Sequence, residues 1–196
     1  MKVLELFSGT HSVGKVCNLL NYEVVSLDLK NADINCNILD WDYKIYPTGH
    51  FDIIWASPPC DTFSILCDSW IGRGKSKESI LNNINNIGLP ILRRTEEIID
   101  YFKPRLWFIE NPQTGKMKNY INKPYYDVDY CKYSNWGYRK RTRVWTNKLN
   151  FDNKLCNKDC INIENGKHKQ DVSITIHSLS DRYRIPEQLI IELITP

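Results

Sequence analysis

The chain has 196 residues and a formal net charge of +3, with 42% hydrophobic and 25% charged residues. This length is enough for one compact domain with its own core, and the composition is typical of a globular chain rather than a disordered one. No apolar run approaches the roughly 20 residues that a membrane span needs, so we expect no membrane protein. Residues 1–7 contain an acidic residue and no small-residue cleavage site, so we expect no signal peptide.

The cysteine content indicates the compartment. Seven cysteines make an odd number, and no feature points to an oxidising environment, so reduced thiols are expected rather than a disulfide framework. We therefore expect an intracellular protein, in the cytoplasm or the nucleus. The richness in Asn, Ile, Lys and Tyr suits an AT-rich viral or parasite genome, and a viral protein would act in the host cell.

Short apolar runs alternate with longer amphipathic segments along the chain. The runs that predict strands lie near residues 3–7, 23–28, 51–55 and 105–110, and those that predict helices lie near 11–21 and 78–102. This alternation predicts an α/β domain with a mostly parallel central sheet. In such folds ligands bind beyond the carboxyl ends of the strands, where we expect the functional residues.

The chain changes character after residue 148. We expect a main domain over residues 1–148 and a short, polar, irregular insertion over 149–176. A C-terminal segment over 177–196 contains an apolar run that begins at Pro186 and should pack back on the core as a helix.

The first predicted strand leads into a glycine-containing turn over residues 7–14. Glycine lets the backbone turn tightly and approach a ligand at the following helix N-terminus, which suits a nucleotide-like cofactor. Gly9 and Lys15 also have the spacing of a phosphate-binding P-loop, but Val16 stands where that loop needs Ser or Thr. The next strand ends at Asp28, whose carboxylate would accept hydrogen bonds from ribose hydroxyl groups. The alternative is that Asp28 only caps the end of the strand.

A cysteine and a glutamate follow two later strands. Cys60 comes after two prolines, which stiffen the backbone that presents its thiol, as a nucleophile requires. The alternative is a buried structural cysteine. Glu110 ends the strand near 105–110 and would meet Cys60 if the two strands are neighbours, where it could share a proton with a ring nitrogen. The alternative for Glu110 is a helix cap.

A basic stretch without Asp or Glu lies near residues 132–148. Its cations are Lys132, Arg139, Lys140, Arg141, Arg143 and Lys148. The aromatic side chains between them suit phosphate contact and base stacking, although a solvated basic strand has the same pattern.

The order of these motifs resembles that of the cytosine-C5 DNA methyltransferases. The matching motifs are the F-S-G turn, P-P-C before residue 61, E-N from Glu110, and R-x-R ending at Arg143. The likeness covers most of residues 1–148 and implies a Rossmann-like, S-adenosylmethionine-dependent methyltransferase fold. Amino-methylating enzymes would instead show P-P-Y or P-P-W. The resemblance therefore implies methylation of cytosine C5 in DNA, with RNA cytosine as the nearest alternative.

The resemblance also implies residue roles. Cys60 would attack cytosine C6, Glu110 would engage N3 and the exocyclic amine, and Arg141 would approach the base with Arg143 supporting it. The residues assigned to the cofactor pocket are Phe7, Ser8, Gly9, Thr10, Asp28, Leu29, Asp40, Trp41, Ser57 and Pro58. The target base must leave the stacked duplex or come from a single strand. Residues 71–77 have the glycines and cations of a closing catalytic loop, or of an ordinary linker.

The sequence departs from the family pattern in two respects. His11 and Ser12 stand where glycine is usual, and Asp61 replaces a glutamine after the nucleophile. The insertion is also too short for the target-recognition domain of bacterial members. Target specificity should therefore be short, relaxed or supplied by a partner.

The insertion supplies candidate metal ligands. Cys156, Cys160 and His168 could join Cys131 in a tetrahedral structural zinc site, or the cysteines could be free. We expect the chain to bind DNA or RNA, to have no membrane partner, and to be a monomer. The rival hypotheses are a catalytically silent nucleic-acid-binding protein and a P-loop nucleotide hydrolase.

Overall fold

The computed structural model describes residues 1–172, 174–176 and 178–195. The expected boundary at residue 177 lies outside the described residues. Within the part of the chain that the structure describes, no helix has the length and apolar character that crossing a membrane requires.

A seven-stranded sheet forms the centre of the molecule, in the order β3-β2-β1-β4-β5-β7-β6. Its strands are β1 (Lys2–Leu6), β2 (Glu23–Asp28), β3 (Ile34–Asn35), β4 (Ile53–Ala56), β5 (Leu106–Pro112), β6 (Tyr125–Asp129) and β7 (Arg141–Thr146). Strands β1 to β5 pair in parallel, and β7 is antiparallel to β5 and β6. This confirms the predicted α/β class with a mostly parallel sheet. The connection after β1 leads to β2 on one side of it, and the chain later returns to form β4 on the other side. A topological switch point therefore lies between β1 and β4.

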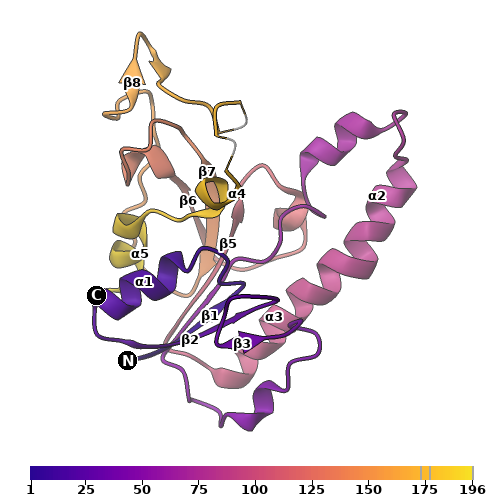
Figure 1. Ribbon diagram of the computed structural model, residues 1–196, viewed down its shortest axis with the longest axis vertical. Coiled ribbons are helices and arrows are strands. Elements are labelled where there is room, and N and C mark those ends of the chain that lie inside the picture. Colours follow the sequence, from indigo (N-terminus) through magenta and orange to yellow (C-terminus); the bar gives the residue numbers. More distant parts are fainter. Residues whose placement is uncertain (173, 177, 196) are drawn as a thin grey trace.

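Helices cover both faces of this sheet. They are α1 (Ser12–Leu19), α2 (Lys77–Asn83), α3 (Leu89–Phe102), α4 (Leu179–Tyr183) and α5 (Glu187–Ile194). Helices α1 and α5 pack on one face and α3 on the other (Figure 1). Successive side chains of a strand point to opposite faces, so β1 supplies Val3 to the first core and Leu4 to the second.

Short helical turns complete the chain. The 3₁₀ helices are η1 (Tyr43–Ile45), η2 (Ile65–Trp70), η4 (Lys116–Asn119) and η5 (Tyr130–Lys132), and η3 (Ile84–Gly88) is a π-helical turn. The helix predicted near 78–102 is therefore continuous from α2 to α3 but has a π-bulge in its middle, an irregularity often found near functional sites.

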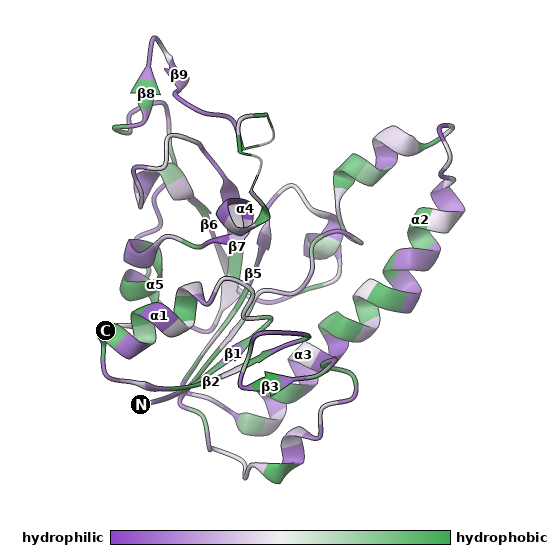
Figure 2. Ribbon diagram, in the orientation of Figure 1, coloured by the Kyte–Doolittle hydropathy of each residue, from purple (hydrophilic) through white to green (hydrophobic). Residues whose placement is uncertain are grey.

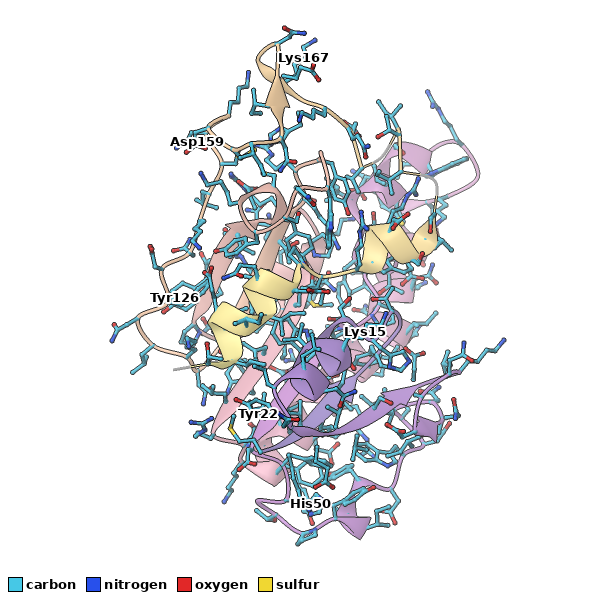
Figure 3. All side chains as sticks on the ribbon, turned by 60° about the vertical axis from the view of Figure 1, so that its left-hand side comes forward. Lys15, Tyr22, His50, Tyr126, Asp159 and Lys167 are labelled. Atoms are coloured by element: carbon cyan, nitrogen blue, oxygen red, sulfur yellow. The ribbon has the colours of Figure 1, made fainter. Side chains whose placement is uncertain are left out.

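The insertion projects beyond the carboxyl edge of the sheet. In Figure 3, Asp159 and Lys167 lie at one end of the molecule and His50, which precedes β4, lies at the other. The segment expected to be irregular contains a hairpin of β8 (Ile163–Glu164) and β9 (Lys167–His168). Asn165 and Gly166 between them both have positive φ, as a two-residue hairpin turn requires. Figure 2 shows that this region is mainly hydrophilic.

The C-terminal segment closes one of the two cores. Leu189, Ile190, Leu193 and Ile194 of α5 are wholly buried among residues that include those of α1. The backbone N–H of Ile185 donates to Ser12 Oγ at 3.1 Å, which ties this segment to the N-terminus of α1.

Candidate active site

Glu5 of β1 caps helix α1 from within the sheet. His11, at the N-cap position, makes no side-chain cap bond, and the Glu5 carboxylate accepts the N–H groups of Val13 at 3.1 Å and Gly14 at 3.0 Å instead. A Cβ on Gly14 would lie 2.8 Å from Glu5 Oε2, so only glycine leaves room for this contact. Burial raises the pKa of Glu5 to about 7, although both backbone N–H groups oppose the shift.

This cap argues against the P-loop hypothesis. A P-loop needs free N–H groups at the helix N-terminus to cradle phosphate oxygens, and Glu5 already occupies two of them with a carboxylate. Lys15 Nζ donates to the carbonyl of Thr10 at 2.9 Å, within its own turn. The turn therefore has fewer free N–H donors than a phosphate would need at this position.

The turn after β1 has a tightly wound backbone. Phe7, Gly9 and His11 have φ values of 60°, 45° and 55°. The N–H of Gly9 donates to Asp28 Oδ2 at 2.9 Å, so the acidic end of β2 holds the turn in place. The N–H of Leu29 donates to the other carboxylate oxygen at 2.6 Å. Because each oxygen retains a further lone pair, Asp28 can still accept hydroxyl donors.

Polar groups suited to a cofactor meet at the switch point. The hydroxyl of Ser8 is buried and has no hydrogen-bond partner among the described residues, so it can serve a ligand. The N–H of Ser57, at the end of β4, donates to the carbonyl of Leu6 at 3.3 Å, which brings Ser57 and Pro58 beside the turn after β1. These residues fit a small polar cofactor at the carboxyl edge of the sheet.

Three other residues assigned to the cofactor pocket differ in their exposure. Trp41 is buried in the core, with its ring centroid 6.5 Å from that of Phe102, and Asp40 beside it is exposed. Leu29 is also exposed. A hollow of about 350 Å³ lies between α1 and the β2–β3 turn, and its lining includes Glu5 and Asp33 but none of the residues assigned to the cofactor.

Cys60 and Glu110 lie at the same edge of the sheet. Their strands β4 and β5 are parallel neighbours, and Asn111 Nδ2 donates to the carbonyl of Pro58 at 2.8 Å, which fixes the Cys60 loop against β5. Burial raises the pKa of the Cys60 thiol, the charge of Glu110 raises it further, and the charge of Lys140 lowers it. The two predicted reacting groups are therefore close enough for their charges to interact.

Tyr130 holds the Glu110 carboxyl in position. Glu110 is 6% exposed, and its Oε1 accepts the phenol of the wholly buried Tyr130 at 3.0 Å. Burial raises the pKa of Tyr130 well above its ordinary value, so the phenol stays protonated and remains a donor. Lys140 Nζ lies 5.0 Å from the centroid of the same ring and donates to the carbonyl of Arg182 at 3.0 Å.

Arg141 and Arg143 form ion pairs across the β6–β7 ladder. Arg141 donates Nε and Nη2 to the carboxylate of Asp129 at 3.0 and 2.6 Å. Arg143 binds Asp127 in the same bidentate way at 2.7 and 2.8 Å. Each arginine therefore has a carboxylate partner in this structure.

The two arginine side chains lie on the opposite face of the sheet from Glu110. Arg143 pairs with Asn111 in the β5–β7 ladder, and neighbouring residues of a strand point to opposite faces. The cation that acts on Cys60 is Lys140 instead. The expected role of Arg141 and Arg143 toward the base remains a prediction.

Two functional candidates escaped the sequence prediction. Lys140 was one cation of a basic stretch, and Tyr130 one of many aromatic residues near it. Their proximity to Cys60 and Glu110 comes from the packing of η5 and the start of β7 over β5, which no local pattern encodes. The spacing that placed Arg141 and Arg143 two residues apart also placed Lys140 on the opposite face.

The loop after Cys60 packs against the π-bulge. A Cβ on Gly88 would lie 2.6 Å from Thr62 Oγ1 and 2.8 Å from the Phe63 ring, so glycine is needed for this close approach. Further along, Gly72 and Gly74 have φ values of 78° and 99°, within the segment expected to act as a hinge. The loop thus has an anchored start and a glycine-rich end.

The four candidate metal ligands come together. The ligand atoms of Cys131, Cys156, Cys160 and His168 all lie within 4.8 Å of one another. None of the cysteines in the structure forms a disulfide.

No family model matches the chain. A curated relative from Frog virus 3 (isolate Goorha), named "Probable DNA (cytosine-5)-methyltransferase", is 44% identical over 99% of each chain. The Entamoeba histolytica methyltransferase EhMeth has a TM-score of 0.52 at 16% identity over 87% of this chain, which shows the fold alone. The S. pombe Dnmt2 methyltransferase has a TM-score of 0.44 at 16% identity over 79% of this chain. The chain spans only 57% and 51% of these two solved structures.

Proposed function

The chain belongs to the DNA (cytosine-5)-methyltransferase family, and from this premise we propose that it transfers a methyl group from S-adenosylmethionine to C5 of cytosine in DNA. The observation that supports this most directly is the meeting of Cys60, Glu110 and Lys140 at the carboxyl edge of β4 and β5. A thiol, a carboxyl group and a cation are the groups that activation of a pyrimidine ring needs.

Each reacting group has a stated task. The Cys60 thiolate adds to C6 of cytosine while Glu110 holds a proton at N3, so the ring gains electron density at C5 without a free charge on nitrogen. Lys140 favours the thiolate, and Tyr130 orients Glu110 through its hydrogen bond. Once C5 has formed its bond to the methyl group that the cofactor would supply, loss of the C5 proton to a base breaks the C6–sulfur bond, releases the Cys60 thiolate and restores the ring.

The cofactor would lie at the switch point of the sheet. Its residues would be Ser8 through the unpartnered hydroxyl, Gly9 through close backbone approach, Asp28 through its spare lone pairs, and Ser57 beside them. When bound, S-adenosylmethionine supplies an electrophilic methyl group. The candidate zinc ligands, for which the sequence left free cysteines as the alternative, form a separate cluster between η5 and the insertion.

The substrate proposal is DNA, with RNA cytosine as the alternative that the experiment separates. We propose that the chain acts inside the cell as a monomer. The short insertion supports a short or relaxed target sequence.

A trapping experiment tests the reaction. The chain is incubated with S-adenosylmethionine and an oligonucleotide containing 5-fluorocytosine, in which fluorine replaces the C5 proton that must leave. A covalent adduct should accumulate at Cys60, detected by mass spectrometry of the modified peptide. Parallel DNA and RNA oligonucleotides identify the substrate, since only the true substrate gives rapid trapping.

Variants make the outcome specific. Cys60→Ala should form no adduct, and Glu110→Gln should slow trapping by about 10² or more, the usual contribution of general acid–base catalysis. Cys67→Ser is the matched control, because Cys67 is another half-buried thiol of the same loop. Methylation at an undiminished rate by Cys60→Ala would overturn the proposed mechanism.

A further inference from the structure

The insertion has almost no apolar core of its own. Of the described residues in 149–176, only Phe151, Cys156 and Asn162 are buried, while Ile161 is 76% exposed. A segment with so little buried apolar surface cannot offset the entropy of its ordering by hydrophobic burial alone. Another interaction must hold it against the domain.

The geometry of four side chains supplies that interaction. His168 Nε2 lies 3.6 Å from Cys156 Sγ and 3.5 Å from Cys160 Sγ. Tetrahedral zinc with ordinary Zn–S and Zn–N bond lengths would separate a sulfur and a nitrogen ligand by about 3.6 Å. Cys131 Sγ completes a set of four ligand atoms within 4.8 Å of one another.

Separate local structures hold these ligands in place. The hairpin turn at Asn165 returns the chain so that His168 on β9 faces the two cysteines. The amide of Asn162 donates to the carbonyl of Cys131 at 3.0 Å, which joins the insertion to η5. Lys132 Nζ lies 2.9 Å from Asp159 Oδ2 and adds an ion pair between the same two segments.

Two of the four ligands are directly linked to the active-site region. Cys131 follows Tyr130 in η5, and the Tyr130 phenol donates to Glu110. The N–H of Cys156 donates at 2.8 Å to Asp129 Oδ2, the same oxygen that accepts Arg141. A metal that holds Cys131 and Cys156 in place would therefore also fix the backbone around the Tyr130–Glu110 hydrogen bond and the Asp129–Arg141 ion pair.

We propose that Cys131, Cys156, Cys160 and His168 bind one structural zinc ion, which fastens the insertion to the sheet and positions the Tyr130–Glu110 and Asp129–Arg141 pairs. Thiolate and imidazole are the ligands that zinc prefers, and four protein ligands leave no open position for catalysis. The zinc site stands independently of the proposed methyl transfer. Only its effect on turnover rests on that function.

Metal analysis tests the site. The full chain, expressed without a histidine tag and purified without chelator, should contain about one zinc ion per molecule, as measured by inductively coupled plasma mass spectrometry. Cys160→Ser and His168→Asn should lose the metal, Cys160→His should retain it, and Cys36→Ser is the matched control outside the cluster. Replacement by Co²⁺ should give the thiolate charge-transfer and intense visible bands of a tetrahedral site. A chain without stoichiometric zinc that cannot be loaded, or one that holds iron instead, would overturn the assignment.

Hydrogen exchange tests the positioning role without any activity measurement. Removal of zinc should speed amide exchange in peptides that cover residues 129–131 and 155–157, while the peptide of β1 keeps its protection. Unchanged exchange in residues 129–131 of a metal-free chain would overturn this half of the proposal. In the 5-fluorocytosine assay, the metal-free chain should trap more slowly than the loaded chain. Absence of trapping by the fully loaded chain would contradict the methyltransferase proposal alone.

Discussion

At the scale of single residues, the charge of Lys140 opposes the rise of the Cys60 pKa. Burial is the largest cause of the raised Cys60 pKa, Glu110 adds to it, and Lys140 is the main group that opposes them. Because thiolate is the nucleophile, the free chain holds Cys60 mainly as an unreactive thiol at neutral pH. A bound base that engages Glu110 would remove the effect of the Glu110 charge on the Cys60 pKa. Substrate binding would therefore favour the reactive thiolate.

Lys140→Met should raise the pKa of Cys60 further. We expect alkylation of Cys60 by iodoacetamide to slow at a fixed pH below that pKa, because a smaller fraction of the thiol is ionised. The measurement is mass spectrometry of the Cys60 peptide across a pH series. Lys148→Met is the control. Lys148 Nζ donates to the backbone carbonyl of Thr195 at 2.6 Å, just as Lys140 Nζ donates to that of Arg182. The same pH profile in Lys140→Met and the original chain would show that Lys140 does not act on Cys60.

Tyr130→Phe should separate positioning from packing. Phenylalanine keeps the buried ring but leaves Glu110 Oε1 without its 3.0 Å hydrogen bond, so we expect a loss of about tenfold in kcat with little change in KM. Tyr133→Phe is the matched control, since the Tyr133 hydroxyl accepts the N–H of Lys154 at 2.9 Å and does not contact Glu110. Equal losses of activity in both variants would mean that Tyr130 acts only through stability.

At the scale of elements, helix α1 depends on a carboxylate from another element. The pKa of Glu5 rises from 4.5 to about 7 on folding because the group is buried. The folded state therefore favours the protonated form, and its stabilising contribution is complete below the unfolded pKa and is lost as the pH rises through about 7. The shift corresponds to about 3 kcal/mol of pH-dependent stability.

Glu5→Gln should abolish that decline, because glutamine stays neutral across the range. Urea unfolding at pH 5 and pH 8 gives the free energy of unfolding for both chains, and the original chain should lose about 2.5 kcal/mol more than the variant, because part of the shift already lies below pH 5. Glu23→Gln is the control, because Glu23 is an exposed residue of the neighbouring strand β2. If Glu5→Gln kept the full pH dependence, some other group would be its source.

The sequence predicted the elements with strong local patterns and missed those set by tertiary pairing. Strands β1, β2, β4 and β5 are rich in apolar residues, so their positions, and those of Cys60 after β4 and Glu110 near the end of β5, were predictable. Strands β6 and β7 alternate charged residues with apolar ones, and they are stable because Asp127 and Asp129 pair with arginines across the ladder. No pattern within either strand shows its partner.

At the scale of the whole molecule, the domain is closed by its last helix. The core on the α1 side combines residues from the start of the chain, such as Val3, with Leu189 and Leu193 of α5. The core on the α3 side contains no residue of α5. Formation of the first core therefore requires contacts between the two ends of the chain. Such contacts carry a higher entropic cost of loop closure than contacts between residues close in the sequence.

Leu193→Ala should consequently destabilise the entire domain rather than α5 alone. The side chain is wholly buried, so we expect a loss of about 2–5 kcal/mol from a total that is typically 5–15 kcal/mol. Urea unfolding followed by tryptophan fluorescence, to which buried Trp55 of the first core and Trp145 of the second both contribute, and by far-ultraviolet circular dichroism should show both signals moving to the same lower midpoint. Gln188→Ala on the exposed side of α5 should leave the free energy of unfolding within about 0.5 kcal/mol of that of the original chain. A Leu193→Ala chain in which the fluorescence and circular dichroism midpoints separated would show that the two cores unfold separately.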